Sequence, residues 1–115
     1  MNTRRDRREL AEALTKRSMC RVKMAAVITD AEGRVVSWGW NHAGRDALGE
    51  HAEEMALKRA NTRRLEGATL TVAGFRKASY VKSLPCLVRC MPRIVKARIA
   101  RVEYHTKEGT WEVME

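Results

Sequence analysis

The sequence predicts an α/β fold in which helices pack against a central mixed sheet of five strands. Two observations carry this prediction. Hydrophobic periodicity switches repeatedly between helical and extended spacing, and the resulting order is helix, hairpin, helix, strand, helix, strand, strand. The chain has 115 residues, of which 44% are hydrophobic. This length suits one compact domain with a buried core, so we expect residues 1–115 to form a single domain.

The first part of the chain predicts a helix followed by a β-hairpin. Residues 4–18 place a short apolar stripe beside a heavily charged face at helical spacing. Residues 24–28 form an apolar run typical of a buried strand, and residues 35–40 form a second strand. The intervening residues 31–33 include a glycine and favour a hairpin turn.

The middle of the chain predicts a loop, a helix and a third strand. Residues 41–50 are polar and contain two glycines, as expected for a loop over a site. Residues 51–61 are strong helix formers with small apolar residues on one face. Residues 68–73 alternate and are β-branched, which favours a strand. A basic connection follows over residues 74–83.

The last third of the chain predicts a helix and two antiparallel strands. A helical stretch ends near Arg98, and residues 99–105 and 110–114 form the fourth and fifth strands. Only about five residues separate these strands, too few for the crossover that a parallel pair needs. We therefore expect the last two strands to form a hairpin.

Two short segments combine the residue types that bind zinc, His51-Ala52-Glu53 and Pro85-Cys86-Leu87-Val88-Arg89-Cys90. A catalytic zinc site uses three nitrogen, sulfur or oxygen ligands and leaves a fourth position for water. His51, Cys86 and Cys90 supply such a set near the starts of two predicted helices, where the helix dipole favours a thiolate. Glu53 can reach a water molecule at the metal without binding the metal, so we expect it to transfer protons.

These residues match the H-x-E…P-C-x-x-C signature, and the chain resembles the zinc-dependent cytidine deaminase superfamily over roughly residues 20–115. The resemblance implies a three-layer cytidine-deaminase-like fold, Zn²⁺ as the cofactor, and hydrolytic release of ammonia from C4 of cytosine or C6 of adenine. The sequence therefore predicts a single zinc-dependent deaminase domain, with His51, Cys86 and Cys90 as metal ligands and Glu53 as the catalytic residue.

The resemblance extends to a second motif. Gly39-Trp40-Asn41 is similar to the GWN segment of bacterial tRNA adenosine deaminases, and the HAEEMAL run that begins at His51 is similar to their HAEIMAL segment. The asparagine of that family contacts the substrate ribose, which implies the same role for Asn41. Because they belong to the matching motifs, Trp40, Ala52 and Pro85 are further candidates for substrate binding.

The chain departs from the signature in one place, because three residues separate Cys86 from Cys90 instead of two. Pro92 would break a helix that began at Cys86. If the helix begins near Cys90, Pro92 falls in its first turn, where proline is well tolerated. We therefore expect Cys86 to lie on an extended turn.

Charge and topology leave the substrate open. The formal net charge of +9, from 23 Lys and Arg against 14 Asp and Glu, favours a polyanion such as single-stranded nucleic acid. The short C-terminal hairpin instead resembles that of nucleoside cytidine deaminases. We favour cytosine in single-stranded nucleic acid, and a free nucleoside or nucleotide is the alternative. A binding module without activity is disfavoured by the intact Glu53.

The remaining expectations concern the cysteines, the tryptophans and the setting. The three cysteines and the absence of an export signal argue against disulfides, and Cys20 is expected to be a small buried residue. Trp38 and Trp40 share one face of a strand, so core packing is expected for both, with base stacking as the alternative. We expect a cytoplasmic protein with no membrane association, in which oligomerisation is possible.

Overall fold

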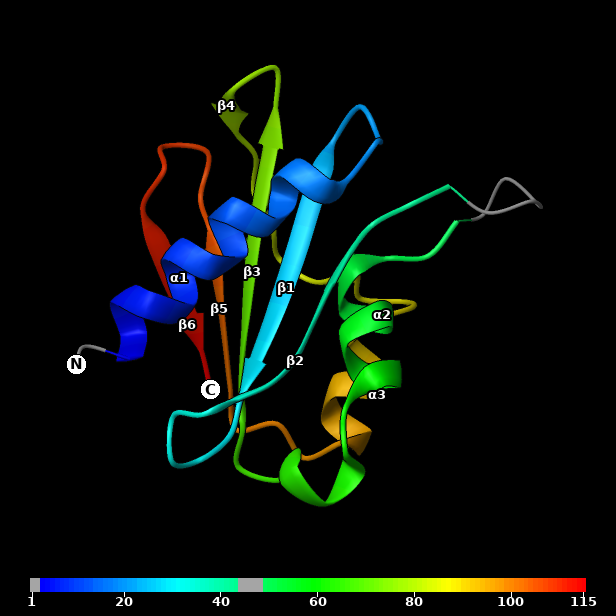
Figure 1. Ribbon diagram of the computed structural model, residues 1–115, viewed down its shortest axis with the longest axis vertical. Coiled ribbons are helices and arrows are strands. Elements are labelled where there is room, and N and C mark those ends of the chain that lie inside the picture. The colour runs from blue at the N-terminus through cyan, green and yellow to red at the C-terminus, as the bar shows by residue number, and fades with distance from the viewer. Residues whose placement is uncertain (1–2, 44–48) are drawn as a thin grey trace.

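The structure is a computed structural model that describes residues 3–43 and 49–115. Its helices are α1 (Thr3–Leu14), α2 (Ala52–Arg59) and α3 (Met91–Lys96), with 3-10 turns η1 (Thr15–Arg17) and η2 (Thr62–Arg64). Its strands are β1 (Lys23–Thr29), β2 (Val35–Trp40), β3 (Thr69–Arg76), β4 (Ser79–Tyr80), β5 (Arg101–His105) and β6 (Trp111–Met114). The middle of the loop expected at residues 41–50 lies outside the described residues. Figure 1 shows α1 crossing the sheet.

The sheet is mixed, as the sequence predicts. Its strands lie in the order β2-β1-β3-β5-β6. The pair β3–β5 is parallel, and the pairs β2–β1 and β1–β3 are antiparallel. The last two strands, β5 and β6, form the expected antiparallel hairpin, in which Val102 lies opposite Met114 and His105 lies opposite Trp111.

The expectation of five strands is wrong by one short strand. Residues 74–83 were expected to form a connection, but β3 continues to Arg76 and turns back into the two-residue strand β4. Lys77 and Ala78 make this turn with positive φ angles of 50° and 63°. Such a turn usually contains glycine or asparagine, so the Lys-Ala pair gives no turn signal in the sequence.

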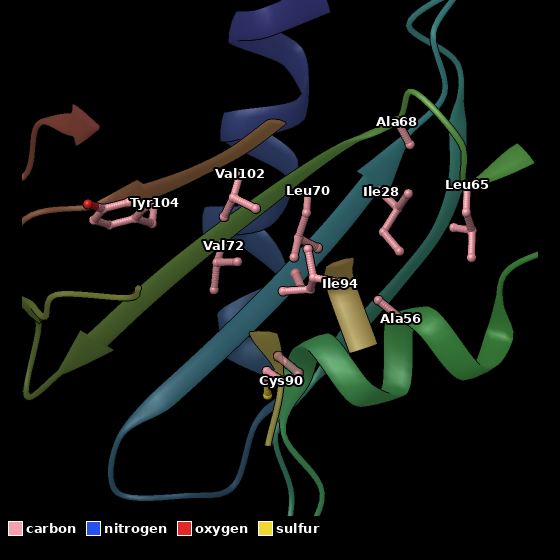
Figure 2. Packing of buried hydrophobic residues seen from close by; sticks show 12 residues of the cluster. Ile28, Ala56, Leu65, Ala68, Leu70, Val72, Cys90, Ile94, Val102 and Tyr104 are labelled. Atoms are coloured by element: carbon pink, nitrogen blue, oxygen red, sulfur yellow. The ribbon is translucent and has the colours of Figure 1, made fainter. Parts of the chain in front are cut away.

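Two clusters of buried side chains divide the molecule into three layers and confirm the predicted α/β architecture. Figure 2 shows part of the larger cluster, in which Ile28, Leu70, Val72 and Val102 of the sheet pack with side chains from α2 and the α3 segment. The smaller cluster joins α1 to the other face through Ala11, Leu14, Ala25, Val27 and Ala73, with Trp40 packed against it. Within the described residues, no helix has the length and apolar character needed to span a bilayer.

The α1 side of the sheet contains a buried ion cluster. Glu103 on β5 is fully buried and accepts hydrogen bonds from Arg7, from Arg8 at 2.9 Å and from Thr71 at 2.8 Å. Burial alone would raise the pKa of Glu103. The hydrogen bonds from Arg7, Arg8 and Thr71 outweigh burial and hold the pKa of this carboxyl below its usual value. The ion pairs between Glu103 on β5 and Arg7 and Arg8 on α1 therefore hold α1 against the sheet.

We expect Glu103→Gln to lower the free energy of unfolding by about 3 kcal/mol at neutral pH, because the buried guanidinium group of Arg7 and the partly buried one of Arg8 lose their counter-charge. The folded-state pKa of Glu103 is lowered, so its stabilising contribution is complete above an unfolded-state pKa of about 4.3 and is lost as the pH falls through the folded value. Urea titrations across this pH range measure the difference between the two proteins. A gap that widened on acidification would contradict this account.

Gly39 determines how closely α2 packs on β2. A Cβ atom at this position would lie 2.7 Å from Ala52 O, from Ala56 N and from Met55 Cβ. Two of these atoms belong to the helix backbone and cannot move alone. Ser37, on the same face of β2, donates a hydrogen bond of 2.7 Å to Ala56 O. The glycine and the serine together hold the helix that carries His51 and Glu53 against the sheet.

Gly39→Ala is expected to lower the free energy of unfolding by about 1–3 kcal/mol, because the added methyl group pushes α2 away from β2. Chemical denaturation followed by circular dichroism measures the effect. Val35→Thr, at an exposed position of the same strand, is the matched control and should change stability little. Equal stability of Gly39→Ala and the wild type would show that the helix is free to shift.

Candidate functional site

His51 is placed by the start of α2. It is the N-cap residue, with extended backbone angles of φ −77° and ψ 155°. Its N–H donates a hydrogen bond of 2.8 Å to Oε1 of Glu54, which stabilises the first turn in the manner of a capping box. The imidazole Nδ1 lies 3.2 Å from Cys90 Sγ. The structure therefore brings together two of the three predicted metal ligands, from segments far apart in the sequence.

The cysteine segment folds as the position of Pro92 predicts. The helix α3 begins at Met91, with Cys90 as its N-cap and Pro92 in its first turn. Before it, the N–H groups of Cys90 and Met91 donate to Cys86 O at 3.0 and 2.9 Å. This turn accommodates the additional residue between the cysteines. Cys90 is fully buried beside the first turn of α2 (Figure 2), whereas Cys86 is half-buried.

The two thiols have opposite electrostatic environments. Burial, together with the negative charges of Glu53, Glu54 and Cys86, raises the pKa of Cys90 to about 12. Backbone N–H groups of Arg89, Val88 and Cys90 lower the pKa of Cys86. A buried thiol surrounded by acidic groups ionises only when a cation compensates the charge. A cation bound beside Cys90 would therefore favour its thiolate form.

The donor set fits zinc in chemistry and in spacing. A tetrahedral zinc ion with ligands at about 2.0 Å (nitrogen) and 2.3 Å (sulfur) separates these two atoms by roughly 3.5 Å, close to the 3.2 Å between His51 Nδ1 and Cys90 Sγ. Cys86 lines the same cavity as His51. Within residues 3–43 and 49–115, however, no three His, Cys, Asp or Glu side chains already have the arrangement of a metal site.

A cavity of about 230 Å³ adjoins these residues. It is lined by Met24, Asn41, His51, Ala52, Glu53, Leu84 and Cys86. Larger hollows lie elsewhere, such as one of about 500 Å³ near Asp30 and Arg101. None of the residues that line that hollow is a histidine or a cysteine. The smaller cavity is lined by three reactive side chains, those of His51, Glu53 and Cys86.

Glu53 is buried at this cavity, with 5% of its surface exposed. Burial raises the pKa of the carboxyl, and hydrogen bonds from its own N–H and from Cys90 only partly offset this effect. The side chain belongs to the first turn of α2, two residues after His51. A carboxyl group held next to a cavity in this way is suited to proton transfer.

Two of the four predicted substrate-binding residues line the cavity and two do not. Asn41 and Ala52 are among its lining residues. Pro85 is fully buried behind it. Trp40 lies on the face of β2 that packs toward α1, because strand residues alternate between faces and Gly39 and Asn41 occupy the α2 side. Trp40 is therefore not among the residues that line the cavity.

The amide of Asn41 is largely engaged within the protein. Its Oδ1 accepts hydrogen bonds from Ser18 Oγ at 2.6 Å and from Met24 N at 2.9 Å, and its Nδ2 donates to Val22 O at 2.8 Å. One N–H of the amide is left for a ligand. Asn41 therefore holds the wall of the cavity in place. The substrate contact predicted for it stays a prediction.

Sequence reasoning missed the residues that hold the two ligand-bearing segments together. Glu54 is 4% exposed, and its Oε2 accepts from Arg89 Nε at 2.8 Å and pairs with Arg93 Nη1 at 3.0 Å. Arg89 also donates to Gly49 O at 2.7 Å. Despite burial, the pKa of Glu54 is held below its usual value by the hydrogen bond from the His51 N–H and by Arg89 and Arg93. The signal available in the sequence was a glutamate three residues after a helix N-cap.

The architecture is shared with solved deaminase structures. A cytidine deaminase from Burkholderia pseudomallei has a TM-score of 0.75 and 21% identity, with 96% of this chain and 91% of that chain covered. A dCMP deaminase from the cyanophage S-TIM5 has a TM-score of 0.70 and 22% identity, with coverages of 89% and 81%. These similarities concern the fold. No curated protein was found to match the chain.

A match to a family model identifies the family, whereas the structural similarities show only the fold. The family model described as the cytidine and deoxycytidylate deaminase zinc-binding region matches residues 1–106, and the chain belongs to this family. The family implies Zn²⁺ as the cofactor, in agreement with the sequence prediction.

We expect Arg89→Ala to weaken zinc binding by about tenfold, because residues that orient metal ligands contribute strongly to metal affinity. Competition with a chromophoric chelator measures the affinity. Leu87→Ala, in the same turn but 71% exposed, is the control and should bind zinc as the wild type does. Unchanged zinc affinity in Arg89→Ala would mean that the contact between Glu54 and Arg89 has no effect on the metal site.

Proposed function

We propose that residues 1–115 form a zinc-dependent hydrolytic deaminase domain that converts cytosine to uracil. The observation that carries this proposal is that His51, Glu53 and Cys86 line one cavity, while Cys90 Sγ lies 3.2 Å from His51 Nδ1. His51, Cys86 and Cys90 would hold the zinc ion. When bound, zinc supplies a Lewis acid that lowers the pKa of water to near neutrality.

Glu53 performs the proton transfers in this proposal. Its carboxylate takes one proton from the attacking water and gives it to the ring nitrogen. It then takes the second proton from the hydroxyl group now on C4 and gives it to the departing amine, which leaves as ammonia. The bond that forms joins water oxygen to C4, and the bond that breaks joins C4 to the exocyclic nitrogen. The buried position of Glu53 keeps its proton away from bulk solvent during these steps.

The size of the cavity limits how much of the substrate it encloses. Drug-sized ligands occupy pockets of about 300–1,000 Å³, whereas this cavity measures about 230 Å³. It therefore suits a single base, with sugar and phosphate lying nearer the surface. The high positive charge of the chain, +9, favours a substrate that carries several phosphates. We therefore propose cytosine in single-stranded nucleic acid as the substrate.

A free nucleoside or nucleotide is the second candidate. Two apolar side chains beside Cys86, those of Leu87 and Val88, are 71% and 88% exposed. Exposed apolar residues next to a site are typical of a surface that another subunit covers. An oligomer in which a neighbour closes the cavity would suit a small substrate. Turnover confined to cytidine or deoxycytidylate, together with a self-associated protein, would favour this candidate.

The zinc-loaded protein is incubated separately with cytidine, deoxycytidylate, single-stranded DNA and single-stranded RNA. We expect cytosine to be converted to uracil within the substrate. The variant Glu53→Ala should retain zinc and lose at least about a hundredfold in rate, because it lacks the proton-transfer group. Chromatography of the products and metal analysis measure the two quantities.

The control is Glu32→Ala, which removes an exposed carboxylate from the β1–β2 turn. It should retain both zinc and activity. Full activity of Glu53→Ala would contradict the role assigned to Glu53, and the absence of uracil from every cytosine substrate would contradict the proposed function.

A further inference from the structure

An aromatic and basic strip runs along the free edge of the sheet. It consists of Trp38 and Trp40 on the edge strand β2, Arg59 at the end of α2 and Arg17 in η1. Core packing was expected for both tryptophans, but Trp38 is 40% exposed, because β2 is the edge strand and Trp40 is the one packed against the α1 cluster. The expectation for Trp38 is therefore wrong.

The two arginines lie over the indole rings. The guanidinium carbon of Arg59 is 5.6 Å from the ring centre of Trp38 and 5.7 Å from that of Trp40. Its Nη1 donates a hydrogen bond of 3.2 Å to Trp38 O, which holds the side chain across the strand. The guanidinium carbon of Arg17 is 5.3 Å from the ring centre of Trp40. Cations and aromatic faces are thus held side by side before any ligand arrives.

The charges of these two arginines are not neutralised within the described part of the chain. Across residues 3–43 and 49–115, neither Arg17 nor Arg59 forms an ion pair with a carboxylate. Many other arginines do form such pairs, among them Arg7, Arg64, Arg89 and Arg101. Both Arg17 and Arg59 are exposed. Their guanidinium groups are available to phosphate oxygens, for which arginine is a preferred partner.

The strip and the proposed catalytic cavity adjoin along the edge strand β2, with the indole rings on its α1 face and the cavity on its α2 face. Trp40 is followed by Asn41, which lines that cavity. At the rise of an extended strand, Trp38 lies about 10 Å from Asn41. A separate hollow of about 130 Å³ beside Trp38 is lined by Val36, Ser37, Trp38 and Arg59. A strand whose target base occupies the cavity can therefore continue along β2.

We propose that Trp38, Trp40, Arg17 and Arg59 bind the single-stranded nucleic acid next to the target cytosine, an inference that rests on the proposed function. A neighbouring base stacks on the exposed indole of Trp38, while Arg59 and Arg17 contact phosphates. Trp40 is the half-buried platform that holds the two guanidinium groups in place. Stacking on an aromatic side chain accepts any base, so the strip adds affinity and not sequence preference.

The test measures binding of short fluorescent single strands, one of DNA and one of RNA, to the zinc-loaded protein by anisotropy. We expect Trp38→Ala to weaken binding by about tenfold, as loss of one stacked base does, and Trp38→Phe to restore most of the affinity. Arg59→Ala should lower the slope of log affinity against log salt by about 0.7, the value for one phosphate contact to a single strand. The DNA and RNA arms show whether the strip distinguishes the two sugars.

Arg4→Ala is the matched control, because it removes the same charge from an exposed position in the first turn of α1. It should leave affinity and salt slope nearly unchanged. Circular dichroism establishes that each variant is folded, and Arg59→Ala tests the strip independently if Trp38→Ala does not fold. Equal affinities of Trp38→Ala, Arg59→Ala and the wild type, or binding of duplex in preference to single strand, would overturn the proposal.

Turnover separates this inference from the function on which it rests. In Trp38→Ala, the ratio of kcat/KM for a single-stranded oligonucleotide to kcat/KM for cytidine should fall about tenfold. Binding that depends on the strip without uracil formation would refute the proposed function and leave the strip as a nucleic-acid site. Uracil formation from oligonucleotides with the wild-type ratio in Trp38→Ala would refute the strip and leave the function standing.

Discussion

The buried carboxylate of Glu54 is the interaction on which the geometry of the site depends. One oxygen accepts the N–H of His51, and the other accepts Arg89 and pairs with Arg93. The proposed ligands come from two segments that no regular hydrogen-bond ladder joins. A buried charge with only one partner would be costly, so Glu54 holds its position only when both segments are in place. Through this carboxylate, the correct placement of α2 depends on the correct placement of the cysteine turn, and the reverse.

The two faces of the sheet hold their helices by different means. On one face, α1 is fixed by buried charges around Glu103, which specify position through hydrogen-bond geometry. On the other face, α2 is held by close apolar packing. Gly39 has no side chain, so the helix backbone can approach β2 closely. The glycine and the asparagine of the Gly39-Trp40-Asn41 segment thus have physical roles in this chain. Gly39 allows the helix to pack closely, and Asn41 links Ser18, just after η1, and Met24 of β1 to the cavity wall.

The sequence predicted those features that follow from chemistry or strong periodicity. His51, Cys86 and Cys90 were recognised as a set because one histidine and two cysteines in this order match a zinc signature, and Pro92 located the start of α3. The two-residue strand β4 could not be predicted, since its turn is made by Lys77 and Ala78. Glu54 and Arg89 were overlooked because charged residues on a helix and in a turn have the pattern of a solvent-exposed surface. Their burial arises only from tertiary packing.

The central claim is that one zinc ion is bound by one histidine nitrogen and two cysteine sulfurs of this chain. X-ray absorption at the zinc edge of the loaded protein measures these ligands directly. The account predicts one zinc ion per chain with two sulfur neighbours at about 2.3 Å and nitrogen or oxygen neighbours at about 2.0 Å. Three sulfur neighbours would bring Cys20 into the site, and a shell without sulfur would place the metal elsewhere. Either result would contradict the assignment of His51, Cys86 and Cys90.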